Sequence, residues 1–257
     1  VELNNPVDYW LAVEDGEVYM NDLIGKKIQL SFTGKINCAL CHRATKKSFS
    51  GFCYSCFSTA PENSECIIRP ELCRGHEGKG RDAEWEQKNH VKDHTVYLAL
   101  TSAVKVGITS SGNENTRWID QGAHEAIEIV ETPNRYLAGV TEVALKNYVA
   151  DKTNWRKMLK NDSSDENLVD WREQLKDHIP EQAQNYFIQS NTETKLYFPV
   201  LKYPEKPVSL NLKKSLEYEG KLVGIKGQYL LFEDQTVFNI RGNEGVVVSL
   251  SIKKHLI

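Results

Sequence analysis

Two closely spaced cysteine pairs are the strongest chemical signal in this 257-residue sequence. Cys38 and Cys41 form one C-x-x-C pair, Cys53 and Cys56 form another, and 11 residues separate the two pairs. Each pair can fold into a tight knuckle, and two knuckles present four thiolates to one tetrahedral zinc ion. Four protein ligands leave no position for water, so the predicted zinc is structural. Two redox dithiols or buried free thiols are the alternative.

A second group of possible metal ligands follows the first. Cys66, Cys73 and His76 have ligand-like types and spacing, and the fourth ligand would come from His90 or His94. The six cysteines of the chain all lie between positions 38 and 73. Such clustering favours metal binding over a disulfide framework. The alternative is that these are surface histidines and small buried thiols.

The segment around the cysteine pairs carries only positive charge, although the whole chain has a formal net charge of −3. Between Leu23 and Pro61 there is no Asp or Glu. The candidate nucleic-acid contacts in this segment are Lys35, Arg43, Lys46 and Lys47. Five aromatic residues are interleaved with them, and such a surface can bind phosphates by charge and bases by stacking. Alternatively, the aromatic side chains pack beneath the ribbon and the lysines are simply solvated.

The elements that must position these residues begin with β-strands. Partial alternation of polarity predicts strands over residues 8–13 and 27–32, before the cysteine-containing, loop-rich stretch of residues 36–90. Acidic and polar residues from 160 to 190 predict a solvated helical segment. Short β-rich runs between glycines from Leu216 to Ile257 predict a compact antiparallel sheet, which can pair with the N-terminal strands.

The middle of the chain has a mixed pattern of strands and helices. Residues 96–100 and 104–108 predict a β-hairpin, and residues 115–119 open a helix with Asn115 or Thr116 as its N-cap. Residues 125–131 predict a third strand. Apolar residues at helical spacing predict a helix over residues 136–148. This order of elements indicates a small mixed α/β domain.

The whole chain is therefore expected to have an α+β fold with three parts. Residues 1–90 would hold the N-terminal strands and the zinc ribbon. Residues 91–160 would form the small α/β domain, and residues 161–257 the acidic helical segment and the Gly-rich antiparallel β region. No apolar run reaches the roughly 20 residues that span a bilayer. The N-terminus lacks the features of a signal peptide, which predicts a cytoplasmic protein.

The central α/β segment, from residue 96 to residue 156, resembles the GIY-YIG nuclease domain. Thr95-Val96-Tyr97 resembles the Gly-Ile-Tyr motif of its first strand, and Lys105-Val106-Gly107 resembles the Tyr-Ile-Gly motif of its second. Arg117 lies where that family has a helical arginine, and Glu142 lies where a later helix supplies a metal-binding glutamate. Asn154 matches a late polar position of the family.

The resemblance implies metal-dependent hydrolysis of a phosphodiester. Glu142 would hold Mg²⁺ or Mn²⁺ as a Lewis acid, and Arg117 would clamp a nonbridging phosphate oxygen. Tyr97 would position or deprotonate the attacking water. This chain departs from the motifs at Thr95, at Lys105 and at Gln121, where many members have glycine, tyrosine and histidine. Lys105 can bind phosphate but is a poor general base.

Each of these residues also has an ordinary structural interpretation. Tyr97 can pack on a half-buried sheet, and Glu142 can be an exposed helical carboxylate. Arg117 can pair with Asp120 on its own helix. Gly107 can occupy a β-bulge.

A larger part of the chain is similar to an uncharacterised prokaryotic family, catalogued as a domain of unknown function. The similarity rests on the segments KKSFSGFCYSCF, RPELC, VYLALTS, KVGIT, RWIDQGA and TNWR. Three functions stay open. The chain can be a zinc-containing endonuclease acting on DNA or RNA, a catalytically degenerate nucleic-acid-binding factor working with translation or repair machinery, or a protein–protein adaptor.

Overall fold

The computed structural model describes residues 1–149 and 154–252, and it divides into two compact units. The first unit consists of Val1–Ser58, Leu159–Asn161 and the chain from Tyr197 onward. The second unit consists of Thr59–Met158 and Asp162–Leu196. Helices and strands both contribute to these units, so the expected α+β class is confirmed. The last five positions of the expected C-terminal sheet region, 253–257, lie outside the described residues.

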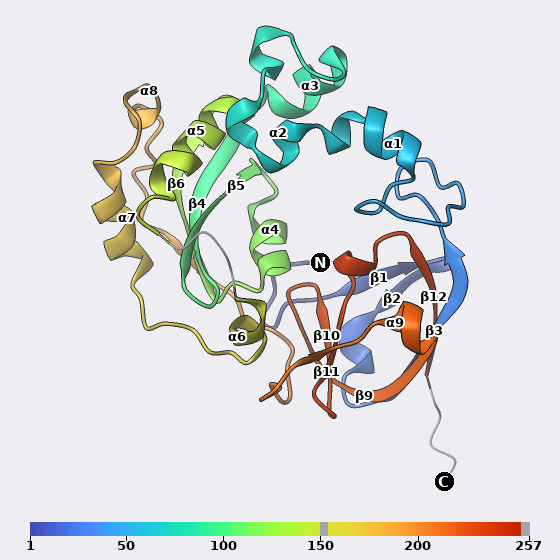
Figure 1. Cartoon of the computed structure of the whole chain (residues 1–257). Coiled ribbons are helices and arrows are strands. Elements are labelled where there is room, and N and C mark those ends of the chain that lie inside the picture. The colour runs from blue at the N-terminus through green and yellow to red at the C-terminus, as the bar shows by residue number, and fades with distance from the viewer. Residues whose placement is uncertain (150–153, 253–257) are drawn as a thin grey trace. The chain divides into compact units, whose positions relative to one another are not determined.

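A six-stranded sheet that joins both ends of the chain forms the first unit (Figure 1). Its strand order is β12-β3-β9-β10-β11-β8, antiparallel except for the parallel pair β11–β8. The strands are β3 (Lys27–Ile36), β8 (Val208–Ser209), β9 (Glu217–Lys226), β10 (Tyr229–Phe232), β11 (Thr236–Asn239) and β12 (Val246–Ile252), and a separate hairpin consists of β1 (Trp10–Val13) and β2 (Gly16–Tyr19). The short helices are α1 (Tyr54–Thr59) and α9 (Leu212–Ser215).

The pairing of the N-terminal strand β3 with the C-terminal strands is the feature that builds this sheet. β3 lies between β12 and β9, so the expected pairing of the two ends is confirmed. Ile28 and Leu30 alternate with more exposed residues along β3, as in a strand with one buried face. In β9 the continuous run 222–226 is buried, which places it at the centre of the sheet.

The second unit is built on a four-stranded antiparallel sheet in the order β5-β4-β6-β7. Its strands are β4 (His94–Leu100), β5 (Val104–Ser110), β6 (Glu125–Thr132) and β7 (Glu193–Lys195). Its helices are α2 (Glu65–Ile68), α3 (Ala83–His90), α4 (Glu114–Gln121), α5 (Arg135–Leu145), α7 (Leu168–Lys176) and α8 (Glu181–Gln184), and α6 (Trp155–Leu159) runs to the border with the first unit.

The predicted elements of the central segment are confirmed, with differences at their ends. The hairpin, the helix, the third strand and the second helix all occur in the expected order. α4 begins one residue earlier than predicted, with Asn113 rather than Asn115 or Thr116 as its N-cap. α5 begins at Arg135, where the side chain of Asn134 accepts a hydrogen bond from the Leu137 amide. The acidic stretch forms α7 and α8.

The two faces of strand β4 differ in what packs against them. Successive strand residues point to opposite faces. One face packs in the apolar core of the unit, whose members include Val96, Leu98 and Leu100 of β4, Leu137 and Leu145 of α5, and Leu168 and Leu175 of α7. Tyr97 points to the other face, where its ring and the Trp118 ring of α4 form an edge-to-face pair with their centroids 6.0 Å apart. The sheet therefore separates its apolar core from a face that carries a polar tyrosine.

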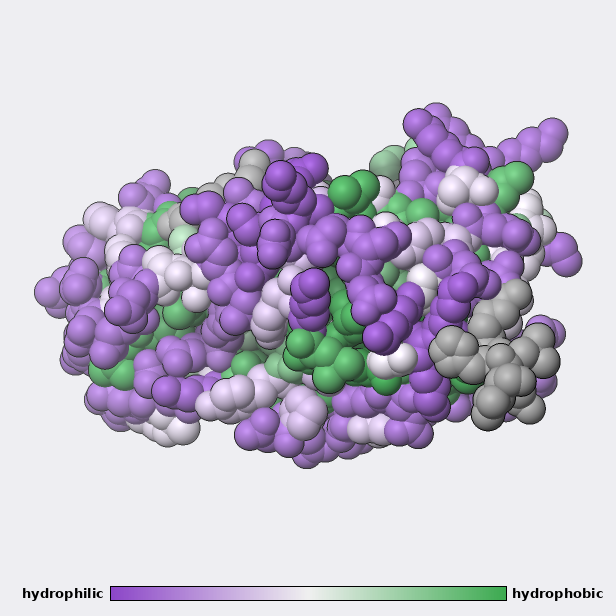
Figure 2. All heavy atoms as spheres, turned by 90° about the horizontal axis from the view of Figure 1, so that it is seen from below, coloured by the Kyte–Doolittle hydropathy of each residue, from purple (hydrophilic) through white to green (hydrophobic). Residues whose placement is uncertain are grey.

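The surface view in Figure 2 shows mainly hydrophilic residues, with apolar residues gathered in small groups among them. Within residues 1–149 and 154–252, no helix combines the length and the apolar character that crossing a bilayer requires.

Candidate metal and phosphate sites

The four cysteines of the predicted ribbon come together at one point in the first unit. Ligand atoms of Cys38, Cys41, Cys53 and Cys56 all lie within 4.8 Å of one another. The sulfurs of Cys41 and Cys53 are 3.9 Å apart. Tetrahedral zinc with bonds of about 2.3 Å places its sulfurs roughly 3.8 Å apart. The arrangement therefore can hold a metal ion such as zinc.

Local backbone geometry explains why these cysteines converge. The His42 amide donates to the Cys38 carbonyl at 2.9 Å, and His42 adopts a left-handed φ of 58°, which closes the first knuckle. A hydrogen bond from Ala39 N to Gly51 O joins the two knuckles. The second knuckle runs directly into α1, where the Phe57 amide donates to the Cys53 carbonyl. Each turn is set by residues within the cysteine segment itself.

The charge around the ribbon favours thiolates. Arg43 Nε lies 3.4 Å from the Cys41 sulfur, and this hydrogen bond lowers the pKa of Cys41 to about 6. Desolvation raises the pKa of Cys56 to about 12. The four sulfurs together therefore need a cation if all are to be ionised. Lys35, Arg43, Lys46 and Lys47 are all exposed, as the phosphate-binding hypothesis requires.

The ribbon aromatic residues pack partly on one another. Phe49 lies 5.8 Å from the Tyr54 ring and 5.5 Å from the Phe57 ring, and Lys47 Nζ lies over the Phe49 ring. Tyr54 remains 70% exposed, which leaves its ring accessible for stacking. Packing beneath the ribbon thus explains Phe49 but not Tyr54.

A second ligand group lies in the second unit, and its membership differs from the expected one. It consists of Cys66, Cys73, Glu86 and His90, with ligand atoms within 4.8 Å of one another. Of the two histidines offered as the fourth ligand, His90 is the one that joins. Glu86 was not predicted, although its spacing of four residues before His90 on α3 places both side chains on one helix face.

The expected ligand His76 lies outside this group. Its ring stacks on Tyr136 at 4.6 Å, so the prediction that His76 joins Cys66 and Cys73 does not match the group in the structure. Proximity in sequence was misleading because the short helical turns after Cys73 direct His76 toward α5. His94 is also outside the group; its Nδ1 lies 2.7 Å from the Lys92 carbonyl. Burial lowers the pKa of His94 to about 4.

Tyr97 is the centre of a polar group formed by β4, β5 and α4. Its hydroxyl accepts a hydrogen bond from Gln121 Nε2 at 2.8 Å, and the nearby positive charge of Arg117 acts to lower its pKa. Gly107 faces Tyr97 across a regular strand pair, not a bulge, and a Cβ there would lie 2.7 Å from the hydroxyl oxygen. Desolvation by burial raises the pKa of Tyr97, so the phenol is protonated at neutral pH.

Glu142 is a buried carboxylate among cations. It is 8% exposed, so the alternative of an exposed helical carboxylate is wrong. Burial raises the pKa of Glu142, while the charges of Lys146, Lys105 and Arg135 act to lower it. Lys146 Nζ lies 3.3 Å from its carboxylate. The charge of Glu142 also acts on the pKa of Tyr97, as that of Arg117 does, and the charge of Lys105 acts on the pKa of Glu142.

Two buried polar atoms near Tyr97 lack a hydrogen-bond partner among the described residues. They are the indole nitrogen of Trp118 and the amide oxygen of Gln121. Buried polar atoms in folded proteins almost always have a partner, so this place can accept a polar group from a ligand. Asn154, the late polar position, instead accepts hydrogen bonds from the Arg156 and Lys157 amides at the start of α6.

The comparison with known protein families identifies the chain by its sequence. Residues 25–248 match the profile of the family described as Protein of unknown function (DUF2797). This match spans most of the chain, which therefore belongs to that family. No curated protein and no solved structure matches the chain significantly.

Proposed function

We propose that this member of the DUF2797 family acts on nucleic acid, as a divergent metal-dependent phosphodiesterase with a GIY-YIG-like central domain. The observation that carries the proposal is that the charges of Arg117 and Glu142 act on Tyr97, and the charge of Lys105 acts on Glu142, although these residues come from four different elements. The order β4-β5-α4-β6-α5 is also the order of elements that the resemblance implies.

Each residue of this site would have a separate role in phosphodiester hydrolysis. Arg117 is exposed on α4, where its guanidinium can hold a nonbridging phosphate oxygen by a bidentate contact. Lys105 adds a second positive charge that offsets the charge developing on the phosphate. Glu142 is a buried oxygen ligand among basic residues, and a single carboxylate together with substrate phosphate is a common way to hold Mg²⁺. A bound divalent ion would supply Lewis-acid polarisation of the phosphate.

Tyr97 has a more limited role than a general base. Its phenol is fully buried, and burial raises its pKa, so it does not deprotonate water at neutral pH. Its hydroxyl instead accepts a hydrogen bond from Gln121 of α4, the helix that also carries Arg117. Tyr97 is therefore a positioning residue in this proposal.

The burial of Tyr97 and Glu142 also favours a second function, which is nucleic-acid binding without cleavage. The Tyr97 hydroxyl already interacts with two side chains, and Glu142 pairs with Lys146 at 3.3 Å. Such a site can grip phosphate through Arg117 while giving little room to an attacking water. The exposed cations of the ribbon would add phosphate contacts in either case. A pure protein–protein adaptor has no evident use for this group.

The test is cleavage of labelled DNA and RNA with Mg²⁺ or Mn²⁺, measured together with binding. The variants are Glu142→Gln and Arg117→Ala, with Glu181→Gln and Lys157→Ala as matched exposed controls in the second unit. We expect metal-dependent cleavage that falls at least a hundredfold in both site variants and not in the controls. Binding without cleavage by the wild type, lost in Arg117→Ala, supports the binding factor. No binding and no cleavage would reject both functions.

A further inference from the structure

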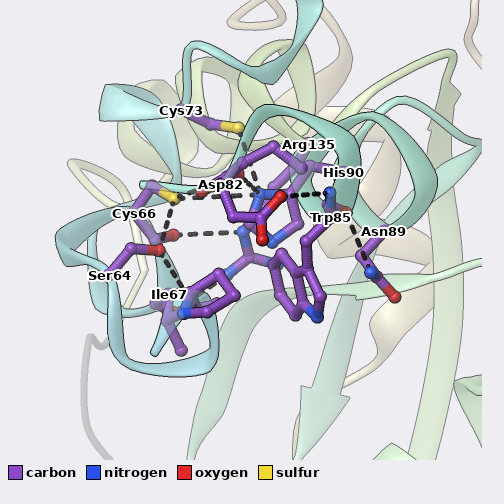
Figure 3. Close-up of polar contacts among 11 residues, drawn as sticks. Ser64, Cys66, Ile67, Cys73, Asp82, Trp85, Asn89, His90 and Arg135 are labelled. Atoms are coloured by element: carbon purple, nitrogen blue, oxygen red, sulfur yellow. Dashed lines mark hydrogen bonds and ion pairs between the residues drawn. The ribbon is translucent and has the colours of Figure 1, made fainter. Parts of the chain in front are cut away.

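Cys66, Cys73, Glu86 and His90 form a buried group of four potential metal ligands. Cys66 lies in α2, Cys73 follows a short helical turn at Pro70–Leu72, and the other two residues lie on α3. Their exposed fractions are 7%, 2%, 1% and 4% respectively. Figure 3 shows the side chains of Cys66, Cys73 and His90 turned toward one another beside Arg135.

The spacing within this group matches a tetrahedral metal site. His90 Nδ1 lies 3.5 Å from the Cys73 sulfur and 3.8 Å from the Cys66 sulfur. Tetrahedral zinc separates a thiolate sulfur from an imidazole nitrogen by about 3.5 Å. The Glu86 carboxylate lies 3.9 Å from the Cys66 sulfur and directly contacts His90 Nδ1, closer than the roughly 3.3 Å that separates an oxygen and a nitrogen ligand of one tetrahedral zinc ion. The two sulfurs and the imidazole nitrogen therefore already have ligand spacing, and Glu86 becomes the fourth ligand when an ion replaces its contact with His90.

The charge around the group also fits a divalent ion. Two thiolates and one carboxylate carry three negative charges, and a divalent cation leaves one of them. Arg135 carries the remaining positive charge, and its guanidinium is held beside the group by hydrogen bonds to the Cys66 carbonyl at 3.0 Å and to the Ile67 carbonyl at 2.8 Å. Without a cation, buried groups of this kind take up protons rather than carry charge. The ribbon cysteines need their own ion, because they belong to the other unit.

We infer that Cys66, Cys73, Glu86 and His90 bind a second zinc-class ion, and that this ion anchors the start of the helix that carries Glu142. A cysteine–histidine–glutamate triad acting on a substrate is the competing interpretation. It requires access to the sulfur, whereas all four side chains are buried. The inference concerns metal binding and helix anchoring, and it stands whether or not the proposed function is correct.

The anchoring follows from contacts between the metal loop and α5. Arg135 is the first residue of α5, and it holds the carbonyls of Cys66 and Ile67. One turn later Gly139 lies so close to the loop that a Cβ there would be 2.4 Å from the Glu71 amide nitrogen. Glu142 follows on the same helix. Loss of the ion would release residues 64–77 and with them the support of the first two turns of α5.

Metal content of the full chain tests the ligand assignment. We expect two zinc ions per chain in wild type purified without chelator, and one in Cys66→Ser and in Cys41→Ser, which each remove one site. His76→Asn is the matched control and is expected to keep two. One zinc per chain in the wild type, or two in Cys66→Ser, would overturn the assignment, as would loss of an ion in His76→Asn.

Cobalt spectroscopy of the wild type tests the second site without any variant, so it does not depend on whether a variant folds. With both sites filled by Co²⁺, each chain has six cobalt–thiolate bonds, against four when only the ribbon is filled. The thiolate-to-cobalt absorption at saturation is therefore expected to be about 1.5-fold that of the ribbon alone, reached in two steps. A single step that saturates at one Co²⁺ per chain would reject the second site.

Hydrogen exchange tests the anchoring separately from activity. In Cys66→Ser, amides of α5 are expected to exchange at least tenfold faster, while those of β9 and β10 keep their wild-type rates. In Cys41→Ser the α5 amides are expected to stay protected. Unchanged protection of α5 in a Cys66→Ser variant that has lost one zinc would leave the metal site in place but refute the anchoring.

Discussion

Replacing Lys226 by methionine is expected to raise stability at neutral pH. Lys226 ends β9 and is fully buried in the first unit. Its Nζ donates to Asn161 Oδ1 at 2.8 Å and lies 5.4 Å from the ring centroids of Phe198 and Tyr203. Burial removes water from the ammonium, so the charged form is disfavoured.

The size of the effect follows from the pKa of this side chain. Burial lowers the pKa of Lys226 from 10.5 to about 7. Between these values the unfolded chain binds a proton that the folded chain does not, so the free energy of unfolding rises with pH. Each pH unit contributes about 1.4 kcal/mol. From pH 7 to pH 9.5 the wild type should therefore gain about 3 kcal/mol from this residue.

Chemical denaturation at several pH values between 7 and 9.5 measures this gain. Other groups titrate in both proteins, so the informative quantity is the free energy of unfolding of Lys226→Met minus that of the wild type. We expect this difference to be positive at pH 7 and to fall by about 3 kcal/mol by pH 9.5. Lys213→Met, at an exposed position in α9, is the matched control and should give a difference independent of pH.

The pH range stops at 9.5 because buried phenols act in the opposite direction above it. Burial raises the pKa of Tyr203, so the unfolded state would gain stability as free tyrosines ionise near pH 10. A difference between Lys226→Met and wild type that stays constant from pH 7 to pH 9.5 would refute the reasoning, because it would mean that Lys226 keeps its proton in the folded state.

Two further predictions concern the contacts of α5 and the charge of the ribbon. Gly139→Ala places a methyl group 2.4 Å from the Glu71 amide nitrogen, so we expect the free energy of unfolding in denaturant to fall by about 1–3 kcal/mol. Val143→Ala, on the exposed face of α5, is the control and should change it little. Equal stability of Gly139→Ala and wild type would contradict the close approach. Removing both charges in Lys46→Ala/Lys47→Ala should weaken nucleic-acid binding and reduce the slope of log affinity against log salt by up to about 2. An unchanged slope would assign these lysines to the solvated surface.

Local patterns in the sequence predicted the local features of the structure. The four ribbon cysteines converge because each C-x-x-C knuckle is a short-range turn, and the joining hydrogen bond spans only 12 residues. Two β-rich runs likewise predicted β4 and β5, and alternating polarity predicted β6, because the tendency to form a strand is largely a property of the segment itself.

The predictions from sequence missed or misplaced features that depend on long-range packing. Glu86 had a readable signal, its spacing of four from His90, but a helix in that loop-rich stretch was not expected. His76 was chosen for its nearness to Cys73, and the backbone turns it toward Tyr136 instead. The contact of Arg135 with the Cys66 carbonyl joins positions 69 residues apart, which no local pattern encodes.

The sequence by itself therefore determined which four cysteines converge in the ribbon and the order of the central elements. Only the tertiary structure decided that β3 lies between β12 and β9, that Tyr97 is buried and protonated, and that Glu86 and His90 complete the second cysteine group. The physical reason is the distance along the chain over which each feature is determined. Turns, helices and strands are set by neighbours in the chain, whereas burial, pKa shifts and ligand sets are set by which distant segments pack together.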